Sequence, residues 1–507
     1  MKLESAYLDY TRGTSDYAGT PSTTAPQAEN IGAPHREILS RLLEIVEPVD
    51  FRTLAEMEDG EKLLKKHFLV IVIEEVLRLA EENNWGLCRN TDFIYLFNGT
   101  FWHQLEPEEI QDFLGRAAER MGVDRFDALH YDFRDKLYKQ FLTLSHLPKP
   151  EPAKDRVCIN LQNGTLEITP SGARLRGHRR EDFLTYVLPF EHNPKAAAPT
   201  FERYLNRVLP DPDKQRILAE FLAYVFVRPS YLKLEKALVL YGSGANGKSV
   251  FFEIVEALLG RENVTNYSLQ SLTDDKGYSR AKIVGKLVNY ASEINASLEA
   301  AAFKALTSGE SIEARLPYGQ PFTATDYAKL IFNCNVLPKE VEHTEGFFRR
   351  FLIVHFDVTI PESEQDKTLS RKIIDNELSG VLNWVLQGLD RLLKQRNFSE
   401  CKAAQAILAK YRLESDSVQM FLADKGYQKS LNEVETLDVL YQEYKTFCLD
   451  DGYKFVSKKT LRERLENSGF QITRRSAGNV VFIGKGSPVK PENEVETSTS
   501  DPNDPPF

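Results

Sequence analysis

A glycine-rich loop between an apolar run and a predicted helix constrains this chain more than any other feature. Residues 237–241 (ALVLY) have the composition of a buried strand, and residues 250–259 continue as an amphipathic helix. The intervening GSGANGKS fits the pattern GxxxxGK followed by Ser or Thr, in strand–loop–helix order. Glycines there let backbone N–H groups turn inward around a polyphosphate at a helix N-terminus. The predicted nucleotide-binding residues are Gly242, Ser243, Gly244, Ala245, Asn246, Gly247, Lys248 and Ser249.

Three residues are expected to carry out nucleotide chemistry with this loop. Lys248 would reach the β- and γ-phosphates of ATP, and the Ser249 hydroxyl would hold Mg²⁺. A second β-prone run, residues 286–293, ends in Glu293. A carboxylate at the end of the neighbouring strand can polarise the attacking water, so Glu293 is predicted to be catalytic and a second Mg²⁺ contact. The residue before it is Ser292, not a second acid.

Two later runs supply further candidate catalytic residues. Residues 328–335 form a β-prone run that ends in Asn335, whose amide could bind the γ-phosphate or the attacking water. An Asn that caps the turn before Pro338 is the alternative. Arg349 and Arg350 open a fourth strand. A guanidinium offered to a nucleotide on a neighbouring subunit would be an arginine finger, whereas a solvated or ion-paired arginine pair is the alternative.

The order of these pieces resembles the superfamily 3 helicase core, in particular the primase-helicase branch of phages, plasmids and poxviruses. The resemblance rests on the P-loop, GKLVNYASE, LIFNCNVLP and GFFRRF, and with NLQNGTLEI it extends over roughly residues 150–395. It implies an AAA+-like α/β P-loop NTPase core, with Glu293 as the Walker B acid and Asn335 as the sensor. Arg349 or Arg350 would be the finger that acts in trans, so the resemblance also implies a homo-oligomeric ring, a hexamer.

Two segments are candidate DNA contacts. Residues 304–322 match the B′ region of that family and include a predicted hairpin, although a plain surface turn is the alternative. Residues 452–486 carry eight Lys or Arg and two acids on a predicted helix–helix–hairpin, the winged-helix pattern. A solvated basic surface or a protein-binding wing would carry the same residues. The candidate DNA-binding residues are Lys304, Arg315, Tyr318, Lys458, Lys459, Arg462, Arg474 and Arg475. Arg464 lies on the same predicted helix as Lys458 and Arg462.

Composition and pattern divide the chain into seven parts and exclude some classes of protein. The five cysteines are scattered and no apolar run approaches the ~20 residues of a membrane span, so a zinc site and a membrane protein are disfavoured. The net charge of −10 gives no overall basic footprint for nucleic acid. The expected parts are a disordered segment 1–34, a mostly helical domain 35–150, a pre-helicase segment 151–229, an ATPase core 230–395, a helical connector 396–433, a winged-helix domain 434–486 and a disordered acidic tail 487–507.

These features predict an ATP-dependent DNA helicase that acts on single-stranded and forked DNA, in the cytoplasm of a bacterial host that carries the phage or mobile element. The N-terminal 150 residues show no acidic constellation typical of a primase, so a separate primase or polymerase is an expected partner. The tail ends in DPNDPPF and resembles the acidic tip of bacterial single-stranded-DNA-binding proteins, which suggests replisome partners. An origin-binding initiator is the alternative function, and a small-molecule kinase is disfavoured by the sensor and finger.

Overall fold

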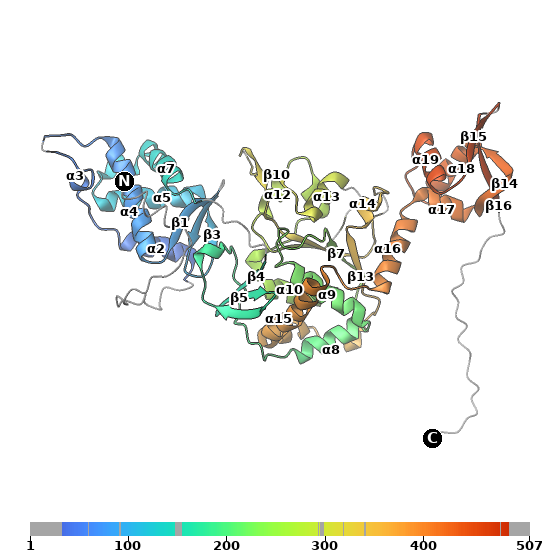
Figure 1. The fold of residues 1–507 in the computed structure, drawn as a ribbon, viewed down its shortest axis with the longest axis horizontal. Coiled ribbons are helices and arrows are strands. Elements are labelled where there is room, and N and C mark those ends of the chain that lie inside the picture. The colour runs from blue at the N-terminus through green and yellow to red at the C-terminus, as the bar shows by residue number, and fades with distance from the viewer. Residues whose placement is uncertain are drawn as a thin grey trace, which may run out of the picture. The chain divides into compact units, whose positions relative to one another are not determined.

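The computed structural model describes residues 33–58, 60–90, 93–147, 155–292, 294, 299–317, 319–338, 341–476 and 478–485 (Figure 1). The predictions for Glu293, Tyr318, the acidic tail and nearly all of the segment 1–34 therefore lie outside the described residues. The chain separates into two compact units, one of residues 1–150 with 178–184 and one of residues 151–177 with 185–507.

The first unit packs helices against a small antiparallel sheet of order β1-β2-β3. Its apolar helix faces, such as Val72 and Val76 of α4, are fully buried in one core. Asn98-Gly99 lies in the hairpin loop between β2 and β3, which pair antiparallel on either side of it. The elements are α2 (His35–Glu44), α3 (Phe51–Leu54), α4 (Lys65–Glu82), β1 (Gly86–Asn90), β2 (Phe93–Phe97), β3 (Trp102–Leu105), α5 (Pro107–Met121), α6 (Arg125–Leu129) and α7 (Tyr131–Leu144).

The second unit opens with three antiparallel strands, β4 (Val157–Leu161), β5 (Gly164–Thr169) and β6 (Gly172–Arg176). The turn at Asn163-Gly164 joins β4 to β5. Glu167 on β5 is 3% exposed and accepts hydrogen bonds from Arg174 and Arg176 at 2.7 and 2.9 Å. Hydrogen bonds from Arg176 and Arg174 lower the pKa of Glu167, which is therefore an ionised, satisfied carboxylate in this sheet.

A five-stranded parallel sheet of order β13-β7-β12-β9-β8 forms the centre of the second unit. Its strands are β7 (Ala237–Tyr241), β8 (Val264–Thr265), β9 (Val288–Ala291), β12 (Lys329–Cys334) and β13 (Phe351–His355). β7 is a continuous apolar run because helices cover both faces of a parallel sheet. All strands run in one direction, so the loops after β7, β9 and β12 meet at the carboxyl edge of the sheet.

Helices α8 (Pro199–Val208), α9 (Pro212–Tyr224), α10 (Lys248–Leu259) and α15 (Leu369–Gln395) gather on one face of this sheet (Figure 1). Gly388 lets α15 lie directly on α9, since a Cβ at that position would come within 2.6 Å of the Ala219 carbonyl oxygen. Aromatic side chains dominate the other face, where Phe303, Phe347 and Phe351 pack together. The elements there are α11 (Leu269–Thr273), α12 (Tyr278–Lys282), α13 (Ala300–Ser308), β10 (Ile312–Arg315), β11 (Pro321–Ala324), α14 (Glu345–Phe348) and α16 (Lys402–Glu414).

The C-terminal elements have a core of their own around Phe421, Tyr444 and Leu461. The helix–helix–hairpin order expected from the sequence is present in α18 (Leu437–Asp450), α19 (Lys458–Asn467), β15 (Ile472–Arg475) and β16 (Gly478–Lys485). The connector expected to be helical over residues 396–433 is only partly so, because after α16 and α17 (Ser417–Asp424) it enters the strand β14 (Tyr427–Thr436). β14 pairs with β16 from Tyr427↔Lys485 to Thr436↔Val480, and this distant partner gives the polar run its strand conformation.

No helix among the described residues is both long and apolar enough to cross a membrane.

Candidate functional site

The glycine-rich loop leaves the carboxyl end of β7 and enters α10. Gly242 donates its N–H to the carbonyl of Cys334 at 3.1 Å, and a Cβ on Gly242 would come within 2.5 Å of the Phe356 carbonyl oxygen and closer still to Asn246. Gly247 is the N-cap of α10 in the left-handed region, with φ of 86°. Both glycines are required by geometry, because a side chain at either would push apart the loop and its neighbours.

Lys248 lies over this loop rather than extending into solvent. Its Nζ donates to the carbonyl of Gly242 at 2.6 Å and to Asn246 Oδ1 at 3.1 Å, and the residue is 7% exposed. Burial lowers the pKa of Lys248, because a desolvated ammonium is less stable than one in water. An anionic phosphate would supply the counter-charge that this buried cation lacks in the loop itself.

Two segments hold the loop from outside, and sequence reasoning identified neither. Tyr204 on α8 donates its hydroxyl to the carbonyl of Gly247 at 2.8 Å. Residues 356–360, which follow β13, form a strap: Phe356 accepts a hydrogen bond from Asn246, and Ile360 donates to Ala245 at 2.8 Å. A buried tyrosine usually bonds its hydroxyl to some acceptor, but no sequence signal indicates which.

The strap is anchored by a lysine that the sequence analysis also missed. Lys214 on α9 is 6% exposed, and its Nζ lies 3.0 Å from both the His355 carbonyl and Asp357 Oδ2. Burial would raise the pKa of Asp357, but the hydrogen bond and charge of Lys214 lower it overall. The carboxylate is therefore ionised and fixes the strap against the loop.

The residues of the loop fit a nucleotide polyphosphate with its divalent cation. Ser249 is exposed in the first turn of α10, where backbone N–H groups have no partner within the helix. The glycine cradle, the buried cation of Lys248 and this helix N-terminus all favour bound negative charge. The chemistry of the donor set is thus that expected for phosphate with Mg²⁺.

Asn335 lies beside this loop. It is exposed and directly follows Cys334, whose carbonyl accepts the hydrogen bond from Gly242. β12 separates β7 from β9, and Phe332 pairs with Ala291, two residues before the position predicted for the catalytic acid. The strands β12 and β9, expected from the β-prone runs 328–335 and 286–293, therefore end at the edge of the sheet where the glycine-rich loop begins.

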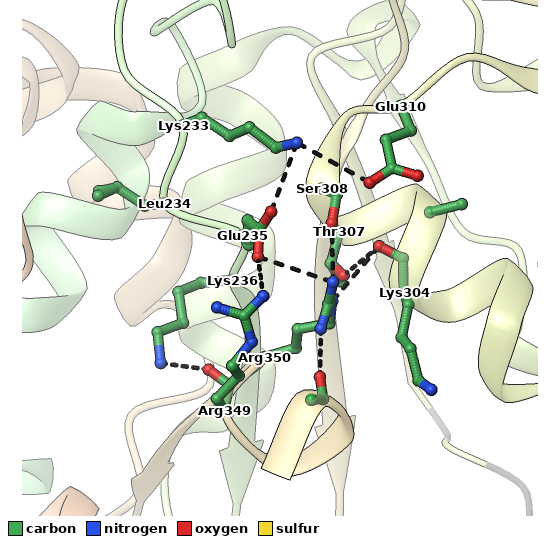
Figure 2. Close-up of polar contacts among 12 residues, drawn as sticks. Lys233, Leu234, Glu235, Lys236, Lys304, Thr307, Ser308, Glu310, Arg349 and Arg350 are labelled. Atoms are coloured by element: carbon green, nitrogen blue, oxygen red, sulfur yellow. Dashed lines mark hydrogen bonds and ion pairs between the residues drawn. The ribbon is translucent and has the colours of Figure 1, made fainter. Parts of the chain in front are cut away.

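Arg349 and Arg350 lie at the opposite edge of the sheet, before β13 begins, in different environments (Figure 2). The Arg350 side chain is buried and donates to the carbonyl of Gly346, to Ser308 Oγ at 3.0 Å and to the carbonyl of Lys304 at 3.4 Å. The Arg349 side chain is 53% exposed and its Nη2 lies 2.6 Å from Glu235 Oε2.

The B′ segment forms a hairpin in which β10 and β11 pair from Ile312↔Ala324 to Arg315↔Pro321. Arg280 fixes the hairpin by donating to the Glu313 carbonyl at 2.7 Å. Arg315 is exposed near the tip, with Nε donating to the Gly319 carbonyl at 2.9 Å. Lys304 is not on the hairpin: it lies on α13 and pairs with Glu342 at 2.7 Å.

The basic residues of the C-terminal elements differ in what they contact. Arg474 and Arg475 are exposed on β15, with the Arg475 guanidinium 5.4 Å from the Phe482 ring. Arg464 instead donates to Asp416, the N-cap residue of α17, at 3.0 Å, and its side chain is 21% exposed. On α19, acids partner the remaining cations: Lys458 with Asp438, Lys459 with Glu463 and Arg462 with Glu466.

Comparisons with known proteins agree with this geometry. Residues 240–350 match a family model described as a family of unknown function, DUF5906, and residues 64–210 match one described as D5 N terminal like. Over 249 residues, 44% of the chain, it is 24% identical to "Putative helicase L207/L206" of Acanthamoeba polyphaga mimivirus. The match covers 25% of that protein, so the chain spans about a quarter of the length of this relative.

Two solved structures of the NrS-1 C-terminal region, both apo A forms, each align with 82% of this chain at 11% identity. They are covered over 99% and 100% of their own lengths, with TM-scores of 0.45 and 0.47.

The parallel sheet and the glycine cradle before α10 define a P-loop NTPase. The two family regions and the helicase relative support the similarity to superfamily 3 helicases of the phage, plasmid and poxvirus primase-helicase type. The resemblance seen in the sequence is thereby confirmed.

Proposed function

We propose that this chain is an ATP-driven, ring-forming DNA helicase that serves the replication of a phage, plasmid or other mobile element. The observation that carries the proposal is the position of Arg349. β13 is parallel to β7 with Phe351 paired to Ala237 and His355 to Tyr241, so Arg349 precedes one edge of the sheet and the P-loop follows the other. Five strand residues span about 16 Å. An arginine there cannot complete its own site and is suited to that of a neighbouring subunit.

The resulting mechanism assigns a separate task to each residue. Lys248 binds the β- and γ-phosphates of ATP, Glu293 orients and deprotonates the attacking water, and Asn335 contacts the γ-phosphate. Mg²⁺, held by Ser249 and Glu293, would neutralise charge on the phosphates. Arg349 from the adjacent subunit stabilises the charge of the transition state, and a homo-oligomeric ring, a hexamer by family resemblance, is the assembly that supplies it.

DNA contacts are proposed at two places. The hairpin of β10 and β11, with Arg315 and Tyr318, would hold one strand in the ring by phosphate contact and stacking. The C-terminal elements would form a winged helix that contacts DNA through Arg474 and Arg475, which are exposed on the strand β15. Lys304, Lys458, Lys459 and Arg462 pair with acids, so their contribution to DNA binding requires exchange of those partners.

ATP hydrolysis with and without single-stranded DNA tests the proposal, with Lys248→Ala as the matched inactive variant. Stimulation by DNA that disappears in the variant, together with strand displacement on forked DNA, is the expected result. Turnover that is indifferent to DNA, combined with salt-sensitive and sequence-specific duplex binding, would favour the initiator function. That alternative draws on the basic strand β15 of a module with its own core.

A further inference from the structure

Glu235 lies among three cations just before β7 (Figure 2). Its Oε2 atom is 2.6 Å from Arg349 Nη2 and 3.6 Å from Arg350 Nη2, and its Oε1 atom is 3.4 Å from Lys233 Nζ. The carboxylate therefore bridges the exposed arginine and the buried one. Nothing in the nucleotide chemistry described above uses this residue.

The backbone at Glu235 is in the left-handed region, with φ of 54°, which is uncommon for a residue other than glycine or asparagine. Neighbouring bonds hold this conformation. Leu234 donates its N–H to the Tyr224 hydroxyl at 3.1 Å, and Lys236 Nζ donates to the Arg349 carbonyl at 2.5 Å. Such a conformation persists where surrounding contacts impose it, and here it aims the carboxylate at the arginine pair.

Arg349 depends on this carboxylate more than Arg350 does. The Arg350 side chain also donates to three other acceptors. The Arg349 side chain donates to Glu235. A half-exposed arginine with no such contact samples many rotamers, and fixing one of them costs conformational entropy. A guanidinium ordered before the subunits meet loses less entropy when it contacts a phosphate.

We propose that Glu235 is a positioning residue. By binding one guanidinium nitrogen of Arg349, it orients that side chain toward the nucleotide of the adjacent subunit. The inference rests on the proposed function of Arg349 as a trans-acting finger. Arg349 Nη2 remains on Glu235 while Nε and Nη1 face the neighbouring phosphate. The buried Arg350, and Lys236 through its bond to the Arg349 carbonyl, hold the backbone that carries Glu235 and Arg349.

The test is ATP turnover of the full chain as an assembled ring, for Glu235→Gln, Glu235→Asp and the control Glu310→Gln. Glu310 is 3.9 Å from Lys233 and contacts neither arginine through its side chain, so its variant removes the same charge from the same cluster. Glu235→Gln is expected to lower kcat about 10- to 100-fold with KM unchanged, since misplacement of a catalytic group by ~1 Å has costs of that size. Glu235→Asp should recover part of this loss, and Glu310→Gln should match the wild type.

Subunit mixing separates positioning from a structural defect. Lys248→Ala subunits are inactive but present an intact finger, so adding them to Glu235→Gln subunits should raise turnover per intact P-loop. A loss of folding in Glu235→Gln would not be rescued this way. Unchanged or increased kcat in Glu235→Gln would overturn the proposal, the latter because Glu235 would then restrain the finger.

The same mixing with Arg349→Ala tests the finger itself. If Lys248→Ala subunits fail to rescue Arg349→Ala, the proposed trans-acting finger is wrong. If they rescue Arg349→Ala while Glu235→Gln alone is fully active, only the role of Glu235 is wrong.

Discussion

Separate replacement of Arg349 and Arg350, the two arginines before β13, should distinguish a residue that stabilises the fold from one that acts in ATP hydrolysis. Arg350→Ala removes a buried guanidinium and leaves the carbonyl of Gly346 and the hydroxyl of Ser308 without their donor. Arg349→Ala removes one half-exposed ion pair. The two variants lose the same charge at adjacent positions, so each is the matched control for the other.

The magnitudes follow from these contacts. A buried acceptor without its donor costs about 1–3 kcal/mol, so Arg350→Ala should lose about 3–5 kcal/mol. At about 2–4 °C per kcal/mol, the value for domains of roughly 150–250 residues such as the predicted ATPase core, Tm should fall by roughly 6–20 °C. A half-exposed ion pair contributes about 1 kcal/mol at most, so Arg349→Ala should keep Tm within about 4 °C. Its turnover should nevertheless fall about 1000-fold or more, the usual contribution of an arginine finger.

Thermal unfolding, sedimentation and ATP turnover on the same preparations measure these effects. Arg349→Ala should form rings and bind ATP normally, yet hydrolyse it slowly. The reasoning is refuted if Arg349→Ala rings turn over ATP at the wild-type rate. It is also refuted if Arg350→Ala unfolds at the wild-type temperature while losing turnover, because the roles of the two arginines would then be exchanged.

Three further predictions concern other parts of the chain. Gly242→Ala should abolish ATP binding, measured with a fluorescent nucleotide, because its Cβ would collide with Asn246 and displace the loop. Glu167 has a lowered pKa in the folded state, so its ion pairs stabilise the fold fully above its ordinary pKa of about 4.5. That stability is lost as pH falls from there through the folded pKa. The urea midpoints of Glu167→Gln and the wild type should therefore converge in acid. Joint Arg474→Ala and Arg475→Ala should reduce the slope of log K against log salt for duplex DNA by about 2.

Each has an outcome that would contradict it. Normal nucleotide affinity of Gly242→Ala would show that the loop adapts to a side chain. A difference in urea midpoint that does not shrink as pH falls below 4.5 would mean that Glu167 acts by packing rather than by charge. An unchanged salt slope in the double arginine variant would exclude β15 from the DNA interface.

Features that are local in sequence were predictable. Residues 237–241 were expected as a strand and form β7 with the same bounds. Five apolar residues directly before GSGANGKS are too few for a buried helix and are typical of a buried strand. The hairpin that pairs Arg315 with Pro321 was likewise expected within residues 304–322 from the local sequence. A turn and its flanking strands are encoded within about 15 residues.

Partners chosen by the sheet topology were not predictable. Glu235 meets Arg349 across 114 residues only because β13 lies beside β7, and no pattern in either segment indicates that order. Tyr204 reaches Gly247 for a similar reason, through the packing of α8 below the P-loop. Residues 396–433 were expected to be a helical connector, and the strand β14 was not foreseen there, because its polar sequence gains strand structure only by pairing with the distant β16.

The hydrogen bond from Tyr204 to Gly247 has a consequence for how this protein can be divided. The region that matches the D5 N terminal like model ends at residue 210, beyond α8, and the DUF5906 region begins at residue 240. The hydroxyl that braces the nucleotide loop thus belongs to the first region, and the loop belongs to the second. A fragment cut between them would strip α8 from its neighbours, expose the apolar faces of Phe201 and Val208, and leave the Gly247 carbonyl to solvent. The smallest piece that keeps the loop as the whole chain has it therefore begins before residue 199, and the boundary between the two family regions falls within the proposed nucleotide site.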